Sequence, residues 1–278
     1  MVRSEGDPLK AVVMSPPSEA YSGVVDRVAH NLPHASDPEL AKAQHHALRL
    51  LCEAEGAAVH LAPPLAGHPN SVFPRDSALV VHEGFVRLRM GLESRRGEEP
   101  WMADYLGSLG LAEIGQIGVN GSADGAGTLE GGDVVLAGDV AFLGRSERSN
   151  AEGLRQLWGV LGRLGYEVRV AEIDSRFMHI GGAMSLVGAE TVLACRDVFP
   201  EGFFRGFEVI EIPGDRDGAS GANVICLGEH NVVAHPGDGP EAPEALDRAG
   251  VRVQLLDLSE FRKGDGGPTC LILPVDRG

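Results

Sequence analysis

The 278-residue sequence has no long apolar run and relatively few basic residues. No stretch approaches the roughly 18 apolar residues of a membrane-spanning helix. The segment Met1–Lys10 is charged and has no apolar core of the kind found in signal peptides. Lys and Arg number 24 against 40 Asp and Glu, which gives a formal net charge of -16. We expect a cytoplasmic protein. Because such a surface repels phosphate backbones and anionic lipids, the protein should bind neither nucleic acid nor membranes, and it should attract small cations.

Cysteine is also scarce. The four cysteines are widely spaced and include no CxxC pair, so the sequence predicts neither a zinc cluster nor a disulfide framework, and no metal site. In a reducing compartment they would remain free thiols. A single cysteine such as Cys270 is more often a small buried side chain than a reactive one, so its role depends on its neighbours.

The sequence contains no polar tract that would serve as a long linker, and helix and strand patterns alternate throughout. A strand is predicted at Lys10–Met14, a helix at Pro38–Glu55 with Asp37 as its N-cap, and a strand at Ala58–Leu61. Later helices are predicted at Pro100–Leu109, after Asn150 and at Pro240–Ala249. We therefore expect one α/β domain that spans residues 1–278.

An internal repeat organises the chain. A polar or Gly-rich opening, a buried strand, a tight turn and a return strand recur five times, anchored at Asp76, Glu130, His179, Asn223 and Cys270. These anchors are separated by 54, 49, 44 and 47 residues. Such a period favours radial repetition, and five units would close a five-bladed α/β propeller with few exposed strand edges. The five openings would then face one axis and meet in a single cavity.

The residue types at these openings suit nucleophilic catalysis. Cys270 would attack, His179 would carry the proton, and Glu130 would orient the imidazole. Asp76 and Asp265 remain as carboxylates without a proton-transfer role, and two carboxylates in one pocket suit a planar guanidinium. From the chemistry alone, attack on an arginine-like guanidine and amide hydrolysis both stay open. A propeller that only binds partners, with Cys270 merely buried, also stays open.

Several motifs give the chain a family resemblance from about Lys10 to its end. It resembles the dimethylarginine dimethylaminohydrolases, which belong with arginine deiminases and amidinotransferases to the guanidine-modifying superfamily of pentein, or five-bladed propeller, fold. The motifs, in order, are Phe73–Asp76 (FPRD), Ser94–Arg96 (SRR), Thr128–Asp133 (TLEGGD), Gly144–Asn150 (GRSERSN), Met178–Ile180 (MHI) and Gly264–Cys270 (GDGGPTC).

The resemblance implies a role for each candidate residue. Cys270 would be the nucleophile, His179 the general acid and then base, and Glu130 the residue that orients His179. Asp76 and Asp265 would hold the guanidinium and the nucleophile loop, and the family's arginines for the substrate α-carboxylate match Arg95 and Arg148. A thiouronium intermediate would form on the cysteine, and methylated arginine would give citrulline and an alkylamine. No metal or organic cofactor would be needed.

Two residues depart from the family pattern. Gly181 stands where arginine deiminases carry an aspartate and the better-known dimethylarginine enzymes a lysine, and Arg75 stands where the latter often carry a glutamate. Gly181 supplies neither charge, which argues against a tight fit to unsubstituted arginine and leaves room for a substituted guanidine or a ureido substrate such as citrulline. Arg75 is the residue type of arginine deiminases at that position. Arginine deiminase and citrulline hydrolase activity are the alternatives, followed by amidinotransferase activity. Assembly as a homodimer stays open, and the loop from Ser18 to Asp37 is the candidate lid by its position and length.

Overall fold

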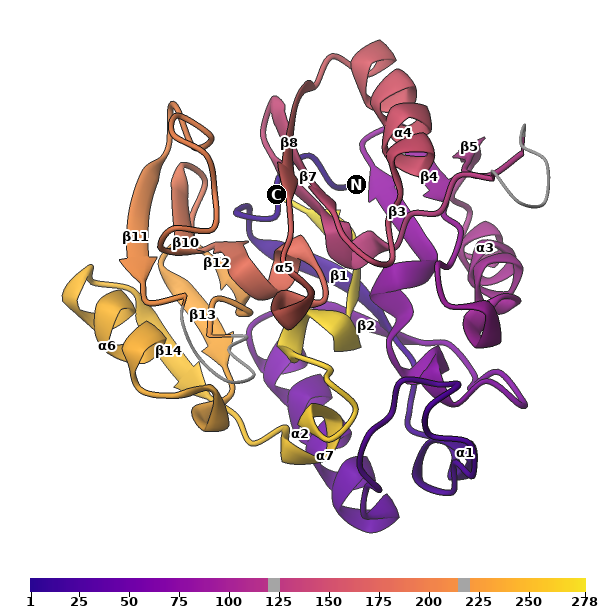
Figure 1. Ribbon diagram of the computed structural model, residues 1–278. Coiled ribbons are helices and arrows are strands. Elements are labelled where there is room, and N and C mark those ends of the chain that lie inside the picture. Colours follow the sequence, from indigo (N-terminus) through magenta and orange to yellow (C-terminus); the bar gives the residue numbers. More distant parts are fainter. Residues whose placement is uncertain (120–125, 215–220) are drawn as a thin grey trace.

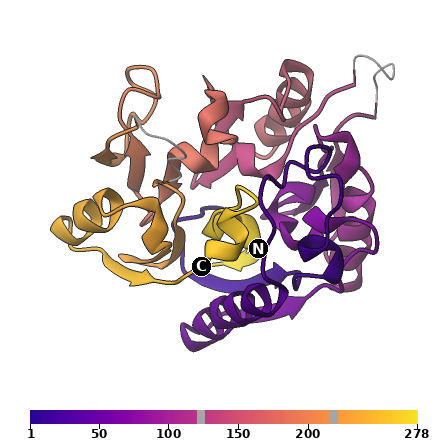
Figure 2. The same cartoon turned by 60° about the horizontal axis from the view of Figure 1, so that its bottom comes forward.

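Five three-stranded sheets form the molecule (Figure 1), and the computed structural model describes residues 1–119, 126–214 and 221–278. In every sheet the strand nearest the middle of the ring pairs antiparallel with the central strand of that sheet, and the central strand pairs parallel with the outermost strand. Figure 2 shows the sheets arranged in a ring with the yellow C-terminal segment near its middle. The predicted five-bladed α/β propeller is thus confirmed.

Each blade contributes an inner, a middle and an outer strand. The inner strands are β3 (Ala78–Val81), β6 (Val134–Ala137), β9 (Met184–Leu186), β12 (Ile225–Gly228) and β15 (Leu273–Arg277). The middle strands are β4 (Gly84–Arg87), β7 (Val140–Arg145), β10 (Thr191–Cys195), β13 (Asn231–Ala234) and β1 (Leu9–Met14). The outer strands are β5 (Glu113–Gln116), β8 (Glu167–Glu172), β11 (Glu208–Ile212), β14 (Arg252–Leu255) and β2 (Ala58–Leu61).

The two ends of the chain close the ring. β15 pairs antiparallel with β1, and Val13 lies opposite Leu273. β1 in turn pairs parallel with β2. The strand that directly follows Cys270 therefore completes a blade begun by the first strand of the chain.

Helices link the middle strands to the outer strands in four blades. They are α2 (Pro38–Ala54), α3 (Glu98–Ser108), α4 (Ala151–Arg163) and α6 (Glu241–Arg248). Asp37 and Asn150 cap α2 and α4 with their side chains, as their residue types predict. In the remaining blade, that of β9, β10 and β11, the residues between β10 and β11 form turns instead. Phe203 and Phe204 pack there against Phe142, and Phe199 packs against both of them.

Burial follows the radial position of a strand. All residues of β3, β6, β9 and β12 are buried, whereas the outer strands β2, β5 and β14 have exposed ends and half-buried centres. Strands covered on both faces carry continuous apolar runs, which explains why the inner strands were recognisable in the sequence. Three short helices, α1 (Glu19–Ser22), α5 (Ile180–Ala183) and α7 (Ser259–Arg262), complete the fold.

A single helical turn precedes the inner strand in four of the blades. These turns are Pro74–Ser77, Gly131–Asp133, α5 and Pro268–Leu271. The predicted polar openings therefore have a common local structure, and each turn delivers a side chain toward the middle of the ring. None of the helices in the described residues has the length and apolar character needed to cross a membrane.

Candidate active site

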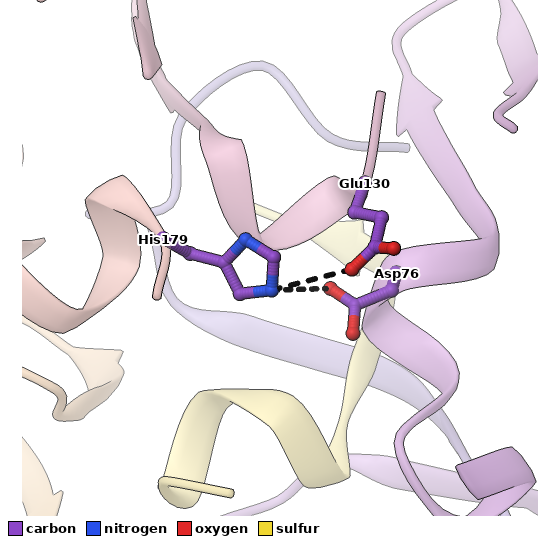
Figure 3. Close-up of side chains that lie close together, drawn as sticks. All are labelled: Asp76, Glu130 and His179. Atoms are coloured by element: carbon purple, nitrogen blue, oxygen red, sulfur yellow. Dashed lines mark ion pairs between the residues drawn. The ribbon is translucent and has the colours of Figure 1, made fainter. Parts of the chain in front are cut away.

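Three of the five openings bring their polar side chains into contact. His179 Nε2 lies 3.4 Å from Glu130 Oε2 and 3.9 Å from Asp76 Oδ1 (Figure 3). All three residues are buried, and they come from three different blades. The turn that carries Cys270 packs against the turn that carries Asp76. The sequence candidates for nucleophile, proton carrier and carboxylates are thus neighbours at the axis.

A second carboxylate holds the other side of the imidazole. His179 Nδ1 lies 3.1 Å from Asp133 Oδ2, and Asp133 Oδ1 accepts the backbone N–H of Ile180 at 3.0 Å. The hydroxyls of Ser146 and Ser149 donate to Asp133 Oδ2 at 2.5 and 2.6 Å. Four bonds therefore fix this carboxylate. Sequence analysis did not single out Asp133, although it ends the TLEGGD run that contains Glu130.

The backbone in front of the histidine is strained. Met178 has φ of 58° and ψ of -50°, and the N–H of His179 donates to the carbonyl of Phe177 at 2.6 Å. A positive φ is uncommon for a residue with a side chain, and such strain collects at functional sites. The tight turn aims the His179 side chain at the axis.

These contacts set the charge of the imidazole. Burial alone would lower the pKa of His179, but Asp133, Asp76 and Glu130 outweigh it and raise the pKa to about 9. The pKa of Asp76 is held at about 2, because Arg95 and His179 outweigh the effect of its own burial. At neutral pH the free site therefore contains an imidazolium beside an ionised aspartate.

The surroundings of Cys270 favour the neutral form of its side chain, in contrast to the charged form favoured at His179. Burial and the negative charge of Asp76 raise the pKa of the Cys270 thiol to about 11, although the Gly267 backbone and the positive charge of Arg75 act against them. Cys270 is therefore a neutral thiol in the free protein. A cation placed beside it would lower its pKa.

Glu130 offers an acceptor that the protein leaves unused. Its Oε1 atom accepts the backbone N–H groups of Gly91 and Leu92 at 2.9 and 3.4 Å. Oε2 is buried and has no hydrogen-bond partner among the described residues, with His179 Nε2 and Arg95 Nη1 at 3.4 and 3.7 Å. A buried acceptor without a donor is costly, and such atoms often mark a site for a ligand.

Arg95 lies deep in the same cluster. Its Nη1 donates to Asp76 Oδ2 at 2.7 Å, and its Nη2 donates to the carbonyl of Phe73 at 3.2 Å. Nε and Nη2 both donate to Glu98, at 3.1 and 2.8 Å. Expected from the sequence to bind a substrate carboxylate, Arg95 here binds carboxylates of the protein. Glu98 follows the SRR motif and was not singled out.

The other two candidates lie toward the rim. Arg148 Nη1 is 3.8 Å from Glu130 Oε1, and its side chain is 13% exposed. Asp265 is exposed and has a left-handed backbone with φ of 58°. Arg262, His34 and Arg148 favour its charged form but do not overcome the rise in its pKa caused by partial burial. The structure thus places Asp265 at the edge of the buried cluster.

The nucleophile turn is held by Asn223, the anchor of the remaining blade. Asn223 Oδ1 accepts the backbone N–H and the hydroxyl of Thr269, both at 3.0 Å. Its Nδ2 donates to the carbonyl of Gly181 at 3.0 Å. A Cβ at Gly267 would lie 2.5 Å from Asn223 Cγ, so only glycine lets the turn approach so closely. Asn223 therefore links the turn of Cys270 to the segment after His179.

Gly132 is required by a similar close approach. A Cβ at this position would lie 2.6 Å from His179 Cδ2 and 3.0 Å from Asp76 Oδ1. Real Cβ atoms essentially never come so near to a neighbour. The middle of the EGGD run is thus glycine because the imidazole lies directly on its backbone.

The two departures from the family pattern have different surroundings. Arg75 is buried and binds Glu5 of the N-terminal segment at 2.7 and 2.9 Å. A Cβ at Gly181 would lie 3.2 Å from the carbonyl of Gly132 and 4.0 Å from Thr269 Oγ1. Arg75 is therefore part of the support of the ring, whereas Gly181 lies in the histidine turn and faces the Gly131–Asp133 turn and the cysteine turn.

Asp76, Glu130 and His179 also have the residue types of a metal site, with ligand atoms within 4.8 Å of one another. A metal needs a neutral imidazole nitrogen. The raised pKa of His179 opposes this state. A guanidinium, which is itself a cation with planar donors, fits two carboxylates and an imidazolium without competing for a lone pair.

Sequence comparison finds a family model and named relatives that match most of this chain. A sequence profile of the family described as N,N dimethylarginine dimethylhydrolase, eukaryotic, matches residues 24–277. An N(G),N(G)-dimethylarginine dimethylaminohydrolase from Pseudomonas aeruginosa is 31% identical over 242 residues, which cover 86% of this chain and 91% of the relative. An arginine deiminase from Listeria welshimeri is 24% identical over 253 residues, covering 75% of this chain and 62% of the relative.

A solved structure extends the similarity to three dimensions. The enzyme from Pseudomonas aeruginosa, solved as a cysteine-to-serine mutant complexed with citrulline, superposes with a TM-score of 0.80 at 28% identity. The match covers 96% of this chain and 99% of that one. The similarity therefore extends over all five blades.

Proposed function

Because the chain belongs to the N,N-dimethylarginine dimethylhydrolase family, we propose that it hydrolyses the guanidine group of methylated arginine to citrulline and an alkylamine. One observation carries the proposal. The buried carboxylates of Asp76 and Glu130, one of them with an unused acceptor, face an imidazolium beside the turn of Cys270. This arrangement suits a planar cation that is attacked by sulfur and loses an amine.

The first step is activation of the thiol. A substrate guanidinium held by Asp76 and Glu130 would place a positive charge next to Cys270. That charge offsets the effect of Asp76, so the pKa of the thiol falls from about 11 and its proton passes to solvent. The bound cation thus generates the thiolate that attacks it.

The first half-reaction then breaks the bond to the alkylamine. The Cys270 sulfur forms a bond to the guanidine carbon, and His179 donates its Nε2 proton to the nitrogen that leaves. A thiouronium remains on Cys270, and His179 is neutral. Asp133 keeps the ring oriented throughout, because it holds Nδ1.

The second half-reaction restores the protein. Neutral His179 takes a proton from water, whose oxygen adds to the thiouronium carbon. The carbon–sulfur bond breaks, the added hydroxyl releases its remaining proton to solvent, and Cys270 leaves as thiolate, which takes up a proton from solvent once the product has departed. The product is a ureido group, so a methylated arginine yields citrulline. Each turnover consumes one water and needs no oxidant or metal.

The substrate's other end would face the rim. We assign its α-carboxylate to Arg148, which is partly exposed and lies beside Glu130. Arg95 could join only by releasing Asp76 with its Nη1 atom. Asp265, at the edge of the pocket and five residues before Cys270, is suited to hold the nucleophile loop or the substrate amino group.

Arginine deiminase activity is the alternative with a specific basis. The similarity to an arginine deiminase extends over 75% of this chain. Against it stands Gly181, which supplies no carboxylate for an unsubstituted guanidinium. N-methyl groups donate no hydrogen bond and need no carboxylate there, which favours a methylated substrate.

A substrate panel tests the proposal. Dimethylarginine, monomethylarginine, arginine, agmatine and citrulline would be assayed for ureido product, amine and ammonia, with Cys270→Ser as the control protein. We expect the methylated arginines to be turned over fastest, with release of alkylamine, and no turnover by Cys270→Ser. Faster release of ammonia from arginine would favour the deiminase, and undiminished turnover by Cys270→Ser would refute the nucleophile.

A further inference from the structure

Glu98 is hydrogen-bonded to Arg95, which in turn contacts the carboxylates of the candidate site. It is the first residue of α3 and is completely buried. Its carboxylate accepts Arg95 Nε and Nη2 at 3.1 and 2.8 Å. On the far side of the same guanidinium, Nη1 donates to Asp76 at 2.7 Å and lies 3.7 Å from Glu130. One arginine is therefore shared by three buried carboxylates.

The sharing affects how much negative charge is available for a substrate. In a site with little water, a guanidinium interacts strongly with every carboxylate in reach. It prefers to bind one carboxylate with two parallel N–H donors. Glu98 receives such a pair from Arg95, with Nε donating to Oε1 at 3.3 Å and Nη2 to Oε2 at 2.8 Å, whereas Asp76 receives only Nη1.

We propose that Glu98 is a positioning residue that holds Arg95 back from Asp76 and Glu130 and so preserves a binding site for cationic guanidines. The inference rests on the proposed function. Without the Glu98 carboxylate, Arg95 Nε and Nη2 lose their anionic partner. The guanidinium then moves onto Asp76 and Glu130, which are the carboxylates already in reach. The protein's own arginine would neutralise the pocket that the substrate cation needs.

The same geometry predicts selectivity between two ligands. Dimethylarginine and citrulline share the amino acid end, but only dimethylarginine is cationic at the reacting end. Loss of negative charge from the pocket therefore penalises dimethylarginine alone. A merely structural role for Glu98 would weaken both ligands together.

Binding to Cys270→Ser protein tests the inference without turnover. Calorimetry would give Kd for dimethylarginine and citrulline with Glu98 intact and with Glu98→Gln added. We expect Glu98→Gln to weaken dimethylarginine by about tenfold or more, and citrulline by less than about threefold. Glu98→Asp, which keeps the charge, should recover part of the preference for the cation.

Glu99→Gln is the matched control. Glu99 is the next residue of α3 and is also buried, but it accepts the backbone N–H groups of Met90 and Gly97. The Glu99→Gln protein should lose thermal stability, while the ratio of its Kd values for dimethylarginine and citrulline should not change. Thermal unfolding of every variant, and the Glu98→Asp result, separate a folding defect from a change in the pocket.

Two results would overturn the inference. They are equal weakening of both ligands by Glu98→Gln, and an unchanged ratio in both Glu98 variants. If the protein with native Glu98 binds no dimethylarginine, both the proposed function and the inference are refuted. This outcome is distinguished from failure of the inference alone because it is seen in protein that still contains Glu98.

Discussion

His179 Nδ1 lies 3.1 Å from Asp133 Oδ2, so the imidazole is oriented by a carboxylate three residues after Glu130. Asp133 is itself fixed by two serine hydroxyls and the N–H of Ile180. Nε2 is thereby turned toward Glu130, the residue expected from the sequence to orient the ring. This leaves Glu130 on the side where a substrate would bind.

Asp133→Asn should lower kcat by about 100-fold or more, the scale of general acid–base catalysis. The amide keeps the size of the side chain but removes the charge that raises the pKa of His179. The pKa of the imidazole should therefore fall from about 9 toward its ordinary value. Steady-state kinetics and NMR titration of the histidine would measure the two effects.

Asp139→Asn serves as the control for that change. Asp139 lies at the turn between β6 and β7 in the same blade, and its side chain is 76% exposed. It should retain full activity. Normal kcat in Asp133→Asn, or an unchanged histidine titration, would argue against an orienting role for Asp133.

The pH dependence of kcat/KM should reveal that the free protein rarely combines the two protonation states that catalysis needs. The thiol of Cys270 titrates near 11 and the imidazole of His179 near 9, yet catalysis needs the thiolate with the imidazolium. The productive form therefore grows with pH until the imidazolium begins to lose its proton. We expect kcat/KM to rise from neutral pH to about 9 and then level off.

Ultraviolet absorbance of the thiolate gives an independent reading. The difference between wild type and Cys270→Ser should show little thiolate at neutral pH, and more when a cationic guanidine is bound. A thiolate already formed in the free protein at neutral pH, with a level kcat/KM profile, is incompatible with activation by the substrate.

Gly132→Ala should reduce activity by about 100-fold or more, because its Cβ would lie 2.6 Å from His179 Cδ2 and force the ring to move. Gly107→Ala is the control. Gly107 lies in α3, and a Cβ there would meet no atom of the described residues within 4 Å, apart from its chain neighbours and the adjacent helix backbone. The control should be active and as stable as wild type or slightly more so. Undisturbed kinetics in Gly132→Ala would mean that the site tolerates a shifted imidazole.

Asn223→Ala should act on the cysteine through its turn. The change leaves two donors of Thr269 and the carbonyl of Gly181 without their partner, which costs about 1–3 kcal/mol for each buried group left unpaired. We expect a lower Tm and a kcat that falls more than KM rises. Asn231→Ala, in β13 of the same blade, removes only contacts near the surface and should leave kcat intact. Equal kinetics in the two variants would contradict the role of Asn223.

The repeat was readable from the sequence because each inner strand is buried on both faces and each opening is polar or Gly-rich. The outer strands β5 and β11 were not predicted, since they are short and mix polar with apolar residues. Asp133 and Glu98 were not singled out because a carboxylate in a turn or at the start of a helix is ordinary. Their roles arise from contacts between blades or with Arg95, which spacing alone does not reveal.

Arg75 illustrates the same limit. The sequence marks it as a departure in a substrate-facing motif, but its guanidinium binds Glu5, 70 residues earlier in the chain. Only the closure of the ring brings that N-terminal segment under the site. A local motif therefore identifies the position, while the partner depends on the whole fold.

The proposed mechanism requires that Cys270 forms a covalent bond to the guanidine carbon. Mass spectrometry of protein quenched during turnover of dimethylarginine would detect this bond. We expect a mass increase equal to the substrate minus dimethylamine, located on the peptide that contains Cys270 and absent from Cys270→Ser. Formation of citrulline with Cys270 unmodified at every quench time, and at the same rate in Cys270→Ser, would contradict it.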